Sequence, residues 1–177
     1  MKSLILGYGN TGQSVKKYLE TLSKEYLIHD DNQDLLRDID EELVFNESKL
    51  KQVHEIVVSP GIKPDHKLLR EFPQKKVKTD IDLFSNKFKG TFIGVTGTNG
   101  KTTFVNLLTN FLNENGIKSI ACGNFGISPL EFESYQDFHA VVELSSFQLY
   151  YSKNLRCDLG VFLNFHSDHL DWHKDIE

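Results

Sequence analysis

The feature that most constrains this chain is a glycine-rich turn between an apolar run and a helical pattern. The turn reads Gly-Val-Thr-Gly-Thr-Asn-Gly-Lys-Thr-Thr over residues 94–103, and apolar residues precede and follow it. Glycines in such a turn let backbone N–H groups converge on phosphate oxygens, and the N-terminus of the next helix adds partial positive charge. The segment therefore predicts a site for a nucleoside triphosphate.

Two side chains of this turn have predicted roles of their own. Lys101 is expected to reach the outer phosphates, and Thr102 is expected to ligate Mg²⁺. Val95 stands where the common phosphate loop has a glycine, so an ordinary glycine-rich turn with a surface lysine is the alternative. The remaining residues of the predicted phosphate-binding loop are Gly97, Thr98, Asn99, Gly100 and Thr103.

Composition excludes several classes of protein. The 177 residues, 39% hydrophobic and 25% charged, fit one large or two small globular domains. A net charge of −5 gives no general attraction to nucleic acid or membranes. The apolar run near the N-terminus is too short for a signal peptide, and no segment approaches transmembrane length. Two cysteines, Cys122 and Cys157, are expected to be reduced and buried, so the sequence predicts a cytoplasmic protein.

Short apolar runs alternate with helical patterns along the whole chain, which predicts an α/β protein with parallel sheets. A polar stretch at residues 85–90 divides the pattern, so we expect a Rossmann-like domain over residues 1–89 and part of a phosphate-loop α/β domain over residues 90–177. Helices are predicted at residues 12–22, 32–38, 65–71 and 102–113. Strands are predicted at residues 3–6, 26–29, 43–45, 55–58, 91–96, 118–122, 139–143 and 159–164.

A second glycine motif follows the first predicted strand. Gly7, Gly9 and Gly12 form a GxGxxG pattern, and Asp30 ends the second predicted strand. This arrangement fits the diphosphate of NAD, FAD or another nucleotide, or else a turn that is shaped only by packing. The Ser-Pro-Gly turn at residues 59–61 lies at the same predicted sheet edge and is equally compatible with a binding turn and a plain turn.

Acidic, amide and histidine side chains follow the later strands. Glu143 ends a buried apolar run, where a carboxylate needs a partner or a metal ion, so it is a candidate for organising Mg²⁺. A salt-bridged strand end is the alternative. Asp168 and His169 lie in a loop that fits either a metal site or an exposed histidine-rich segment. Asn124, in a glycine turn after another strand, is placed to reach a substrate.

These segments, in this order, resemble the Mur ligase family. The family shares a loop like residues 96–103 in place of the common phosphate loop, which accounts for Val95. The Gly-Asn-Phe-Gly turn at 123–126, the Glu-Leu-Ser-Ser-Phe-Gln-Leu run at 143–149 and the Asp-His-Leu-Asp segment at 168–171 resemble the branch that adds D-glutamate. The resemblance covers the whole chain.

The resemblance implies roles for individual residues, with ATP and Mg²⁺ as cofactors. Lys101, Glu143 and His169 would be catalytic, and Thr102, Glu143 and His169 would belong to metal sites. The family often has a small hydroxyl residue where this chain has Asp31. The implied ATP-binding residues are Gly97, Thr98, Asn99, Gly100, Lys101, Thr102 and Thr103. The implied residues for the UDP-muramoyl substrate are Gly9, Asn10, Thr11, Asp30, Asp31, Ser59, Gly61, Asn124 and Ser145.

The implied reaction is ATP-dependent amide bond formation through an acyl phosphate, which joins D-glutamate to UDP-N-acetylmuramoyl-L-alanine. This step belongs to peptidoglycan precursor synthesis, and so to cell-wall biogenesis, cell shape and cell division. The family has three domains, of which we expect a whole first domain here, a central domain that stops early and no third domain. The family's metal-bridging lysine would fall beyond Glu177, so this chain alone is expected to be inactive as a ligase.

Small-molecule substrates are the expected partners, with no nucleic acid or membrane, and the longer protein is expected to be a monomer. A nicotinamide-dependent dehydrogenase would explain the first glycine motif but not Lys101. A small phosphate-loop kinase or GTPase would explain Lys101 but not the domain before it.

Overall fold

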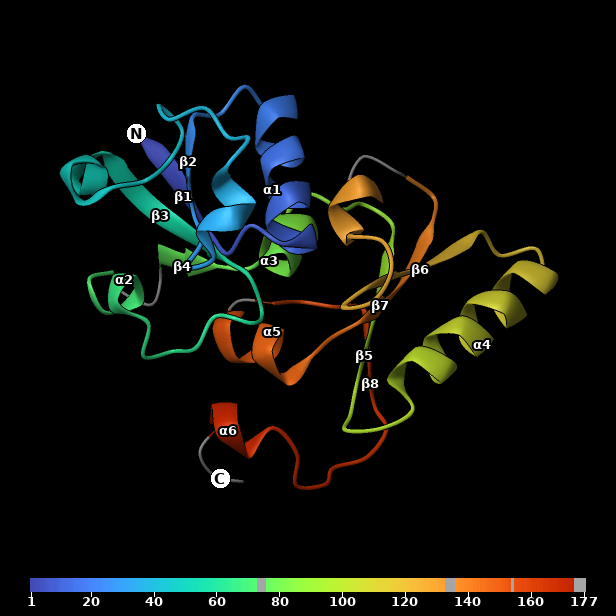
Figure 1. Cartoon of the computed structure of the whole chain (residues 1–177). Helices are drawn as coiled ribbons and strands as arrows, with labels where there is room; N and C mark the ends of the chain where they lie inside the picture. The colour runs from blue at the N-terminus through green and yellow to red at the C-terminus, as the bar shows by residue number, and fades with distance from the viewer. Residues whose placement is uncertain (73–75, 133–135, 154, 174–177) are drawn as a thin grey trace.

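The computed structural model describes residues 1–72, 76–132, 136–153 and 155–173, and it contains two four-stranded sheets (Figure 1). The strand orders are β2-β1-β3-β4 and β6-β7-β5-β8, and every pair is parallel. This arrangement confirms the predicted α/β class. The sheets are formed on either side of the polar stretch at 85–90, while the domain boundary at residues 89 and 90 stays a prediction.

The first sheet and its helices alternate along the chain. The elements are β1 (Lys2–Leu6), α1 (Asn10–Thr21), β2 (Tyr26–His29), η1 (Gln33–Leu36), η2 (Glu47–Gln52), β3 (Val53–Val58), α2 (Lys67–Arg70), β4 (Val77–Lys78) and α3 (Asp80–Ser85). Leu6 pairs with His29 on one side and with Val58 on the other. The glycine turn after β1, the acidic pair after β2 and the Ser-Pro-Gly turn after β3 therefore follow one edge of the sheet.

The second sheet repeats this arrangement. Its elements are β5 (Thr91–Thr96), α4 (Lys101–Glu114), β6 (Ser119–Gly123), η4 (Pro129–Phe132), β7 (His139–Glu143), α5 (Ser146–Tyr151), β8 (Leu159–Phe162) and α6 (Leu170–His173). Val95 pairs with Glu143, and Glu143 pairs in turn with Gly123. The lysine-containing turn, Glu143 and the turn after β6 consequently meet at one edge.

Several parts of the first unit differ from the expectation. The helix predicted over residues 32–38 is the four-residue 3₁₀ helix η1, and η2 was not predicted. The predicted strand at residues 43–45 is wrong, because only Val44 bridges to Ile28 and the ladder does not continue. β4 has two residues, too few for a pattern to reveal it. α3 was also not predicted, because its acidic residues suggest solvent. Thr79 and Asp82 instead form a reciprocal cap at its start, in which Thr79 Oγ1 accepts from the Asp82 N–H and the Asp82 carboxylate accepts from the Thr79 N–H.

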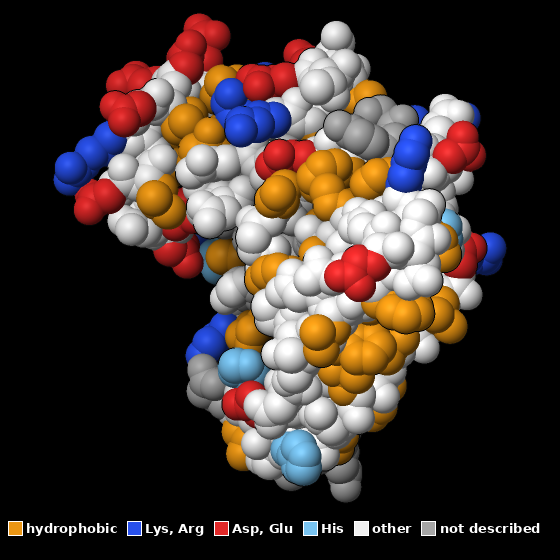
Figure 2. Space-filling view, turned by 90° about the vertical axis from the view of Figure 1, so that its right-hand side faces the viewer, with side chains coloured by type: hydrophobic (Ala, Val, Ile, Leu, Met, Phe, Trp, Pro, Cys, Tyr) orange, Lys and Arg blue, Asp and Glu red, His pale blue; other side chains and the backbone are white. Residues whose placement is uncertain are grey.

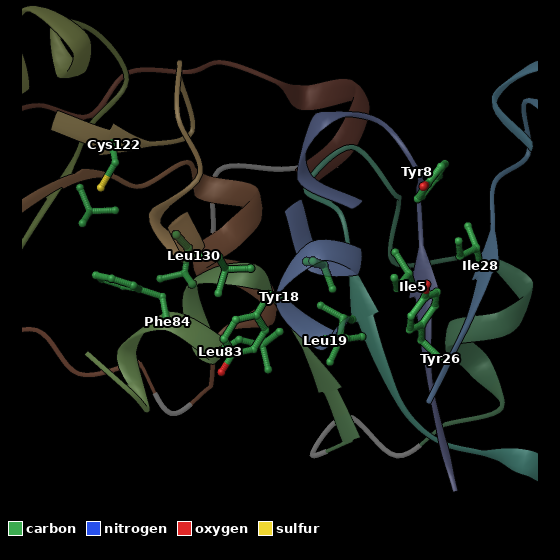
Figure 3. Packing of buried hydrophobic residues seen from close by; sticks show 14 of the residues in the cluster. Ile5, Tyr8, Tyr18, Leu19, Tyr26, Ile28, Leu83, Phe84, Cys122 and Leu130 are labelled. Carbon is green, nitrogen blue, oxygen red and sulfur yellow. The ribbon is translucent and has the colours of Figure 1, made fainter. Parts of the chain in front are cut away.

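One apolar core joins the two sheets (Figure 3). Tyr18 and Leu19 of α1 pack with Leu83 and Phe84 of α3, and Leu130 of η4 completes this contact from the second unit. Phe84 is fully buried and lies 5.5 Å from Phe92 of β5, measured between ring centroids. Since residues of both sheets exclude water from the same cluster, the two units are packed together rather than merely tethered.

The outer face of the second sheet is covered by α4 (Figure 1). Val105 of α4 packs on Ile93, Val95 and Val141 of the strands beneath. Figure 2 faces the side of the molecule that carries α4, and apolar side chains gather on its lower half. Leu107 and Phe111 of α4 are among the large apolar side chains exposed to solvent.

The two cysteines differ from each other. Cys122 is buried, as predicted, and burial raises its pKa to about 12. Cys157 is exposed, so the prediction of a second buried thiol is wrong; this residue lies in the loop before the edge strand β8. No helix within the described ranges is long and apolar enough to cross a membrane.

Candidate functional site

The first glycine turn is held closely by its neighbours. A Cβ atom on Gly12 would lie 2.1 Å from the carbonyl oxygen of Gly7, and one on Gly7 would lie 2.8 Å from the Cβ of Ser59. The Ser59 hydroxyl donates to the Gly7 carbonyl at 2.8 Å. The turns after β1 and β3 are therefore in direct contact, which requires glycine at positions 7 and 12.

Asp30 organises this turn through backbone N–H groups. Its carboxylate accepts from the N–H of Tyr8 at 2.6 Å and from the N–H of Asn32 at 2.8 Å. Sequence reasoning assigned Asp30 to the nucleotide directly, and the contacts show that it also fixes the turn. The assignment to the nucleotide stays a prediction.

Both helices that follow a glycine turn begin without a side-chain cap from the described residues. Gly9 precedes α1 and Gly100 precedes α4, and neither offers a side-chain acceptor to the first N–H groups. Uncapped N–H groups at a helix N-terminus form a site for an anion. The predicted substrate residues Asn10 and Thr11 are the first two of α1, so they lie at such a site.

Lys101 lies across its own loop. Its ammonium donates to the carbonyl of Gly97 at 2.7 Å and to that of Thr98 at 2.9 Å. Gly97 has φ of 147° and Gly100 has φ of 81°, both in the region that disfavours other residues. The ammonium is thus held beside the turn, where it can exchange carbonyl oxygens for phosphate oxygens.

Glu143, Thr102 and Asn124 meet at the end of β7. The Thr102 hydroxyl donates to Glu143 Oε2 at 2.6 Å, and the Asn124 amide donates to Glu143 Oε1 at 3.3 Å. Glu143 is 3% exposed, and these two hydrogen bonds, from residues 41 and 19 positions away, satisfy its carboxylate. The sequence also allowed a salt bridge to Glu143 at the end of its strand. In the structure, the neutral side chains of Thr102 and Asn124 donate to this carboxylate instead.

Sequence reasoning missed Asn164, which holds the far side of the loop. Its side-chain oxygen accepts from the Asn99 N–H at 2.9 Å, and its amide donates to the Asn99 carbonyl at 2.9 Å. Thr98 makes a similar reciprocal pair with the backbone of His166 at 3.2 and 2.9 Å. The signal in the sequence was an amide side chain two residues after β8, at the edge of the sheet where the loop lies.

A cavity of about 370 Å³ opens beside the loop. Lys101, Asn124, Ser145 and His169 line it, together with the aromatic ring of Phe147. His169 Nε2 lies 3.7 Å from its neighbour Asp168, and its ring lies 4.9 Å from that of Phe147. The structure therefore brings Thr102 and Glu143 into contact, whereas His169 lies on the wall of the cavity, so its role as a metal ligand stays a prediction.

The Ser145 hydroxyl caps α5. It accepts from the Gln148 N–H at 3.2 Å and lies 3.1 Å from Gln148 Oε1. Gln148 in turn donates to the buried carboxylate of Asp80 at 3.3 Å, and burial raises the pKa of Asp80 to about 6. Ser145 thus links the cavity to the contact between the two units.

Asp31 has histidine partners. Its carboxylate lies 3.4 Å from the Nε2 atoms of His29 and His66. Burial lowers the pKa of His29 despite this carboxylate. Burial also favours the protonated form of Asp31, but hydrogen bonds from the histidines outweigh it and hold the pKa of Asp31 below its usual value.

Comparison with known proteins places these two sites in a family. Residues 1–79 match the model described as Mur ligase MurD-like, N-terminal domain, and residues 95–177 match the Mur ligase middle domain. The chain belongs to the Mur ligase family. The family explains why two parallel-sheet units, each with a glycine turn, follow one another.

Curated relatives support this membership along nearly the whole chain. The UDP-N-acetylmuramoylalanine–D-glutamate ligase of Francisella philomiragia is 39% identical over 99% of this chain and 42% of its own length. The enzymes of the same name from Rickettsia prowazekii and Leptospira interrogans are each 38% identical, over 97% and 100% of this chain and 40% and 39% of their own lengths. The chain thus spans about two fifths of these relatives.

A solved structure supports the fold. The UDP-N-acetylmuramate:L-alanyl-gamma-D-glutamyl-meso-diaminopimelate ligase of Neisseria meningitides aligns with 99% of this chain and 64% of its own chain. The TM-score is 0.51 and the identity is 18%. At that identity the likeness concerns the arrangement of helices and strands alone.

Proposed function

We propose that this chain binds UDP-N-acetylmuramoyl-L-alanine through its first sheet and ATP through its second, and that it serves the ATP-dependent addition of D-glutamate to that acceptor. The observation that carries the proposal is the contact of Thr102 with buried Glu143 beside the Lys101 loop. A hydroxyl, a carboxylate and an ammonium at the end of parallel strands suit a nucleoside triphosphate with its metal ion.

The donor set fits Mg²⁺. The ion prefers oxygen ligands, and Thr102 and Glu143 supply a hydroxyl and a carboxylate 2.6 Å apart. Bound there, Mg²⁺ would offset the charge of the phosphates. Lys101, released from Gly97 and Thr98, would contact the outer phosphates. His169 is proposed as a further metal ligand on the evidence of its sequence motif alone.

The chemistry requires two anions to approach each other. The terminal carboxylate of the acceptor attacks the γ-phosphorus of ATP, which gives an acyl phosphate and ADP. The amine of D-glutamate then attacks the acyl carbon, and the tetrahedral intermediate expels phosphate. The Lys101 ammonium stabilises the charge on the transferred phosphoryl group. Asn124 and Ser145 line the cavity, and we assign to them the orientation of the muramoyl part of the acceptor.

The acceptor's diphosphate is assigned to the first glycine turn. The uncapped N-terminus of α1 offers N–H groups to an anion, and Asp30 and Ser59 hold the turn in place. Gly9 and Gly61 have open space where a side chain would stand, so a ligand has room to approach their backbone. Asp31 borders this edge of the sheet.

The proposed function also implies where the reaction takes place and with which partners. Because ATP is consumed and a UDP-linked precursor is extended, we place the reaction in the cytoplasm, in peptidoglycan precursor synthesis, with small molecules as partners and a monomeric protein. We also predicted that this chain alone does not complete the reaction. Membership of the family does not test this, so it stays a prediction.

Calorimetric titration of this chain tests the proposal. We expect Mg²⁺-ATP and UDP-N-acetylmuramoyl-L-alanine to bind independently, UDP to bind more weakly and NADH not to bind. Lys101→Ala should weaken ATP binding by about 100-fold, since charge-assisted hydrogen bonds contribute about 1.5–3 kcal/mol each. The same variant should leave the UDP ligand unaffected. Binding of NADH in place of the UDP ligands would instead assign the first turn to a dehydrogenase.

A further inference from the structure

A cluster of three metal-binding side chains lies outside the loop that contains Lys101. It consists of His29 at the end of β2, Asp31 two residues later and His66 immediately before α2. One ligand atom of each residue lies within 4.8 Å of those of the other two. Within the described part of the chain, it is the group of three or more histidine, cysteine and acidic side chains whose ligand atoms lie this close together.

The spacing of the cluster fits a tetrahedral ion. Zinc binds imidazole nitrogen and carboxylate oxygen at about 2.0–2.2 Å, so two ligands of one tetrahedron lie about 3.4 Å apart. The Asp31 oxygen lies 3.4 Å from His29 Nε2 and 3.4 Å from His66 Nε2. Two edges of the tetrahedron therefore already have the required length.

Burial and packing give the cluster a fixed base and an open side. The side chains of His29 and His66 are 15% and 11% exposed, whereas that of Asp31 is 68% exposed. The His29 ring packs edge-on against Phe45 and against the His66 ring, with centroids 5.8 and 5.9 Å apart. An ion can thus enter past Asp31, and a fourth coordination position would face solvent.

The hydrogen bonds of His66 reveal which tautomer the metal-free chain adopts. Its Nδ1 accepts from the Leu68 N–H at 3.3 Å, so the neutral ring carries its proton on Nε2, facing Asp31. Metal binding through Nε2 would move that proton to Nδ1 and break the bond to Leu68. At 3.3 Å this N–H···N bond is long, and its loss is a small cost beside metal ligation.

We propose that His29, Asp31 and His66 form a Zn²⁺ site that ties the end of β2 to the loop between β3 and α2. β2 and β3 lie on opposite sides of β1, so the ion would join two loops across the edge of the first sheet. Imidazole ligands favour zinc over Mg²⁺, which prefers oxygen. The site involves neither ATP nor the second sheet, but it shares Asp31 with the residues that the resemblance implies for the UDP-muramoyl substrate, so zinc binding is measured without that substrate.

Calorimetry with ZnCl₂ on the tag-free chain tests the site, with MgCl₂ as a parallel titrant. We expect one zinc ion to bind, and His66→Gln or His29→Gln to weaken that binding by more than about 100-fold, since even residues that merely support a metal ligand contribute 10–100-fold. His54→Gln is the matched control, because His54 also lies beside a carboxylate, Glu55, on the same sheet but outside the cluster. Circular dichroism of each variant verifies that it folds.

Two further measurements separate this site from others. His169→Gln removes one of the histidines that line the ATP-side cavity and should leave zinc affinity unchanged. Histidine ¹H–¹⁵N correlation spectra should show the His66 proton on Nε2 before zinc is added and on Nδ1 afterwards, a change that a purely structural His66–Asp31 contact would not produce. Zinc affinity that survives both His29→Gln and His66→Gln, or no zinc binding at all, would overturn the proposal.

Discussion

The two glycine turns follow equivalent parallel strands, yet they are held in different ways. The turn after β1 is fixed by close packing, with Gly12 against the Gly7 carbonyl and Gly7 against Ser59. The turn after β5 is held by exchangeable polar contacts, from Lys101 to its own carbonyls and from Asn164 to Asn99. The first turn is therefore fixed by packing without a ligand, whereas the proposed binding of phosphate at the second turn would exchange at least the Lys101 hydrogen bonds.

The strongest test of this contrast is a pair of glycine variants in the first turn. We expect Gly12→Ala to lower the free energy of unfolding by about 3 kcal/mol, because its methyl group would overlap a backbone carbonyl. Gly9→Ala, three residues earlier, meets no heavy atom within 4 Å and should change stability by less than about 0.5 kcal/mol. Urea unfolding measures both, and equal effects would show that packing does not fix this turn.

The next test concerns the contact between the regions. Burial raises the pKa of Asp80 to about 6 in the folded state, above its ordinary value of 3.8, so the folded protein binds this proton more tightly than the unfolded chain. The contribution of Asp80 is therefore fully present below pH 4 and is lost as pH rises through 6, by at most about 3 kcal/mol. Relative to Asp80→Asn, wild type should lose stability between pH 4.5 and pH 7 in urea unfolding. If the difference in unfolding free energy between wild type and Asp80→Asn stays constant over this pH range, the pKa of Asp80 is not raised in the folded protein.

A smaller loss of stability is expected when the hydrogen bond between Thr102, after the second turn, and Glu143 of β7 is removed. Thr102→Val removes the donor to Glu143 Oε2 and leaves that buried oxygen without this partner, which should cost about 2 kcal/mol of unfolding free energy. Thr102→Ser keeps the hydroxyl and should stay close to wild type. If the two variants are equally stable, the Thr102–Glu143 bond does not hold the turn in solution.

The smallest expected effect separates backbone strain from packing in the second turn. Gly100 has φ of 81° and open space around the position of a Cβ atom, so Gly100→Ala should cost about 1 kcal/mol from backbone conformation alone. Gly100→Asn should cost less, because asparagine tolerates positive φ. Thermal unfolding of the two variants compares them, and a larger loss for asparagine would indicate steric contact instead.

The sequence predicted the elements that apolar runs define. The strands at 26–29, 91–96 and 139–143 were predicted with their observed bounds, because each contains a short apolar run that is followed by a polar residue at the end of the strand. α3 was missed because acidic residues such as Asp80 and Asp82 are usually exposed to solvent. Both are buried here, and they accept hydrogen bonds from Gln148 and Ser152 of the other unit. Such partners become visible only when both units are assembled.

In the candidate site, as in the fold, local patterns could be predicted from the sequence and contacts between distant segments could not. The Lys101 turn and Glu143 follow from local patterns, since each lies at the end of its own strand. The meeting of His66 with His29 and Asp31 joins segments 35 residues apart through loops, and loop paths have no periodic signal. The Asn164 pairing with Asn99 is missed for the same reason, over a separation of 65 residues.

The apolar cluster that contains Tyr18, Phe84 and Leu130 has a consequence for how the molecule opens. Because α1, α3 and η4 bury one another, neither sheet can lose its inner helices without exposing the core of the other. Amide hydrogens in β1 and in β7 should therefore exchange with solvent deuterium through a common cooperative opening. A destabilising change in either glycine turn would then accelerate exchange in the strands of both sheets.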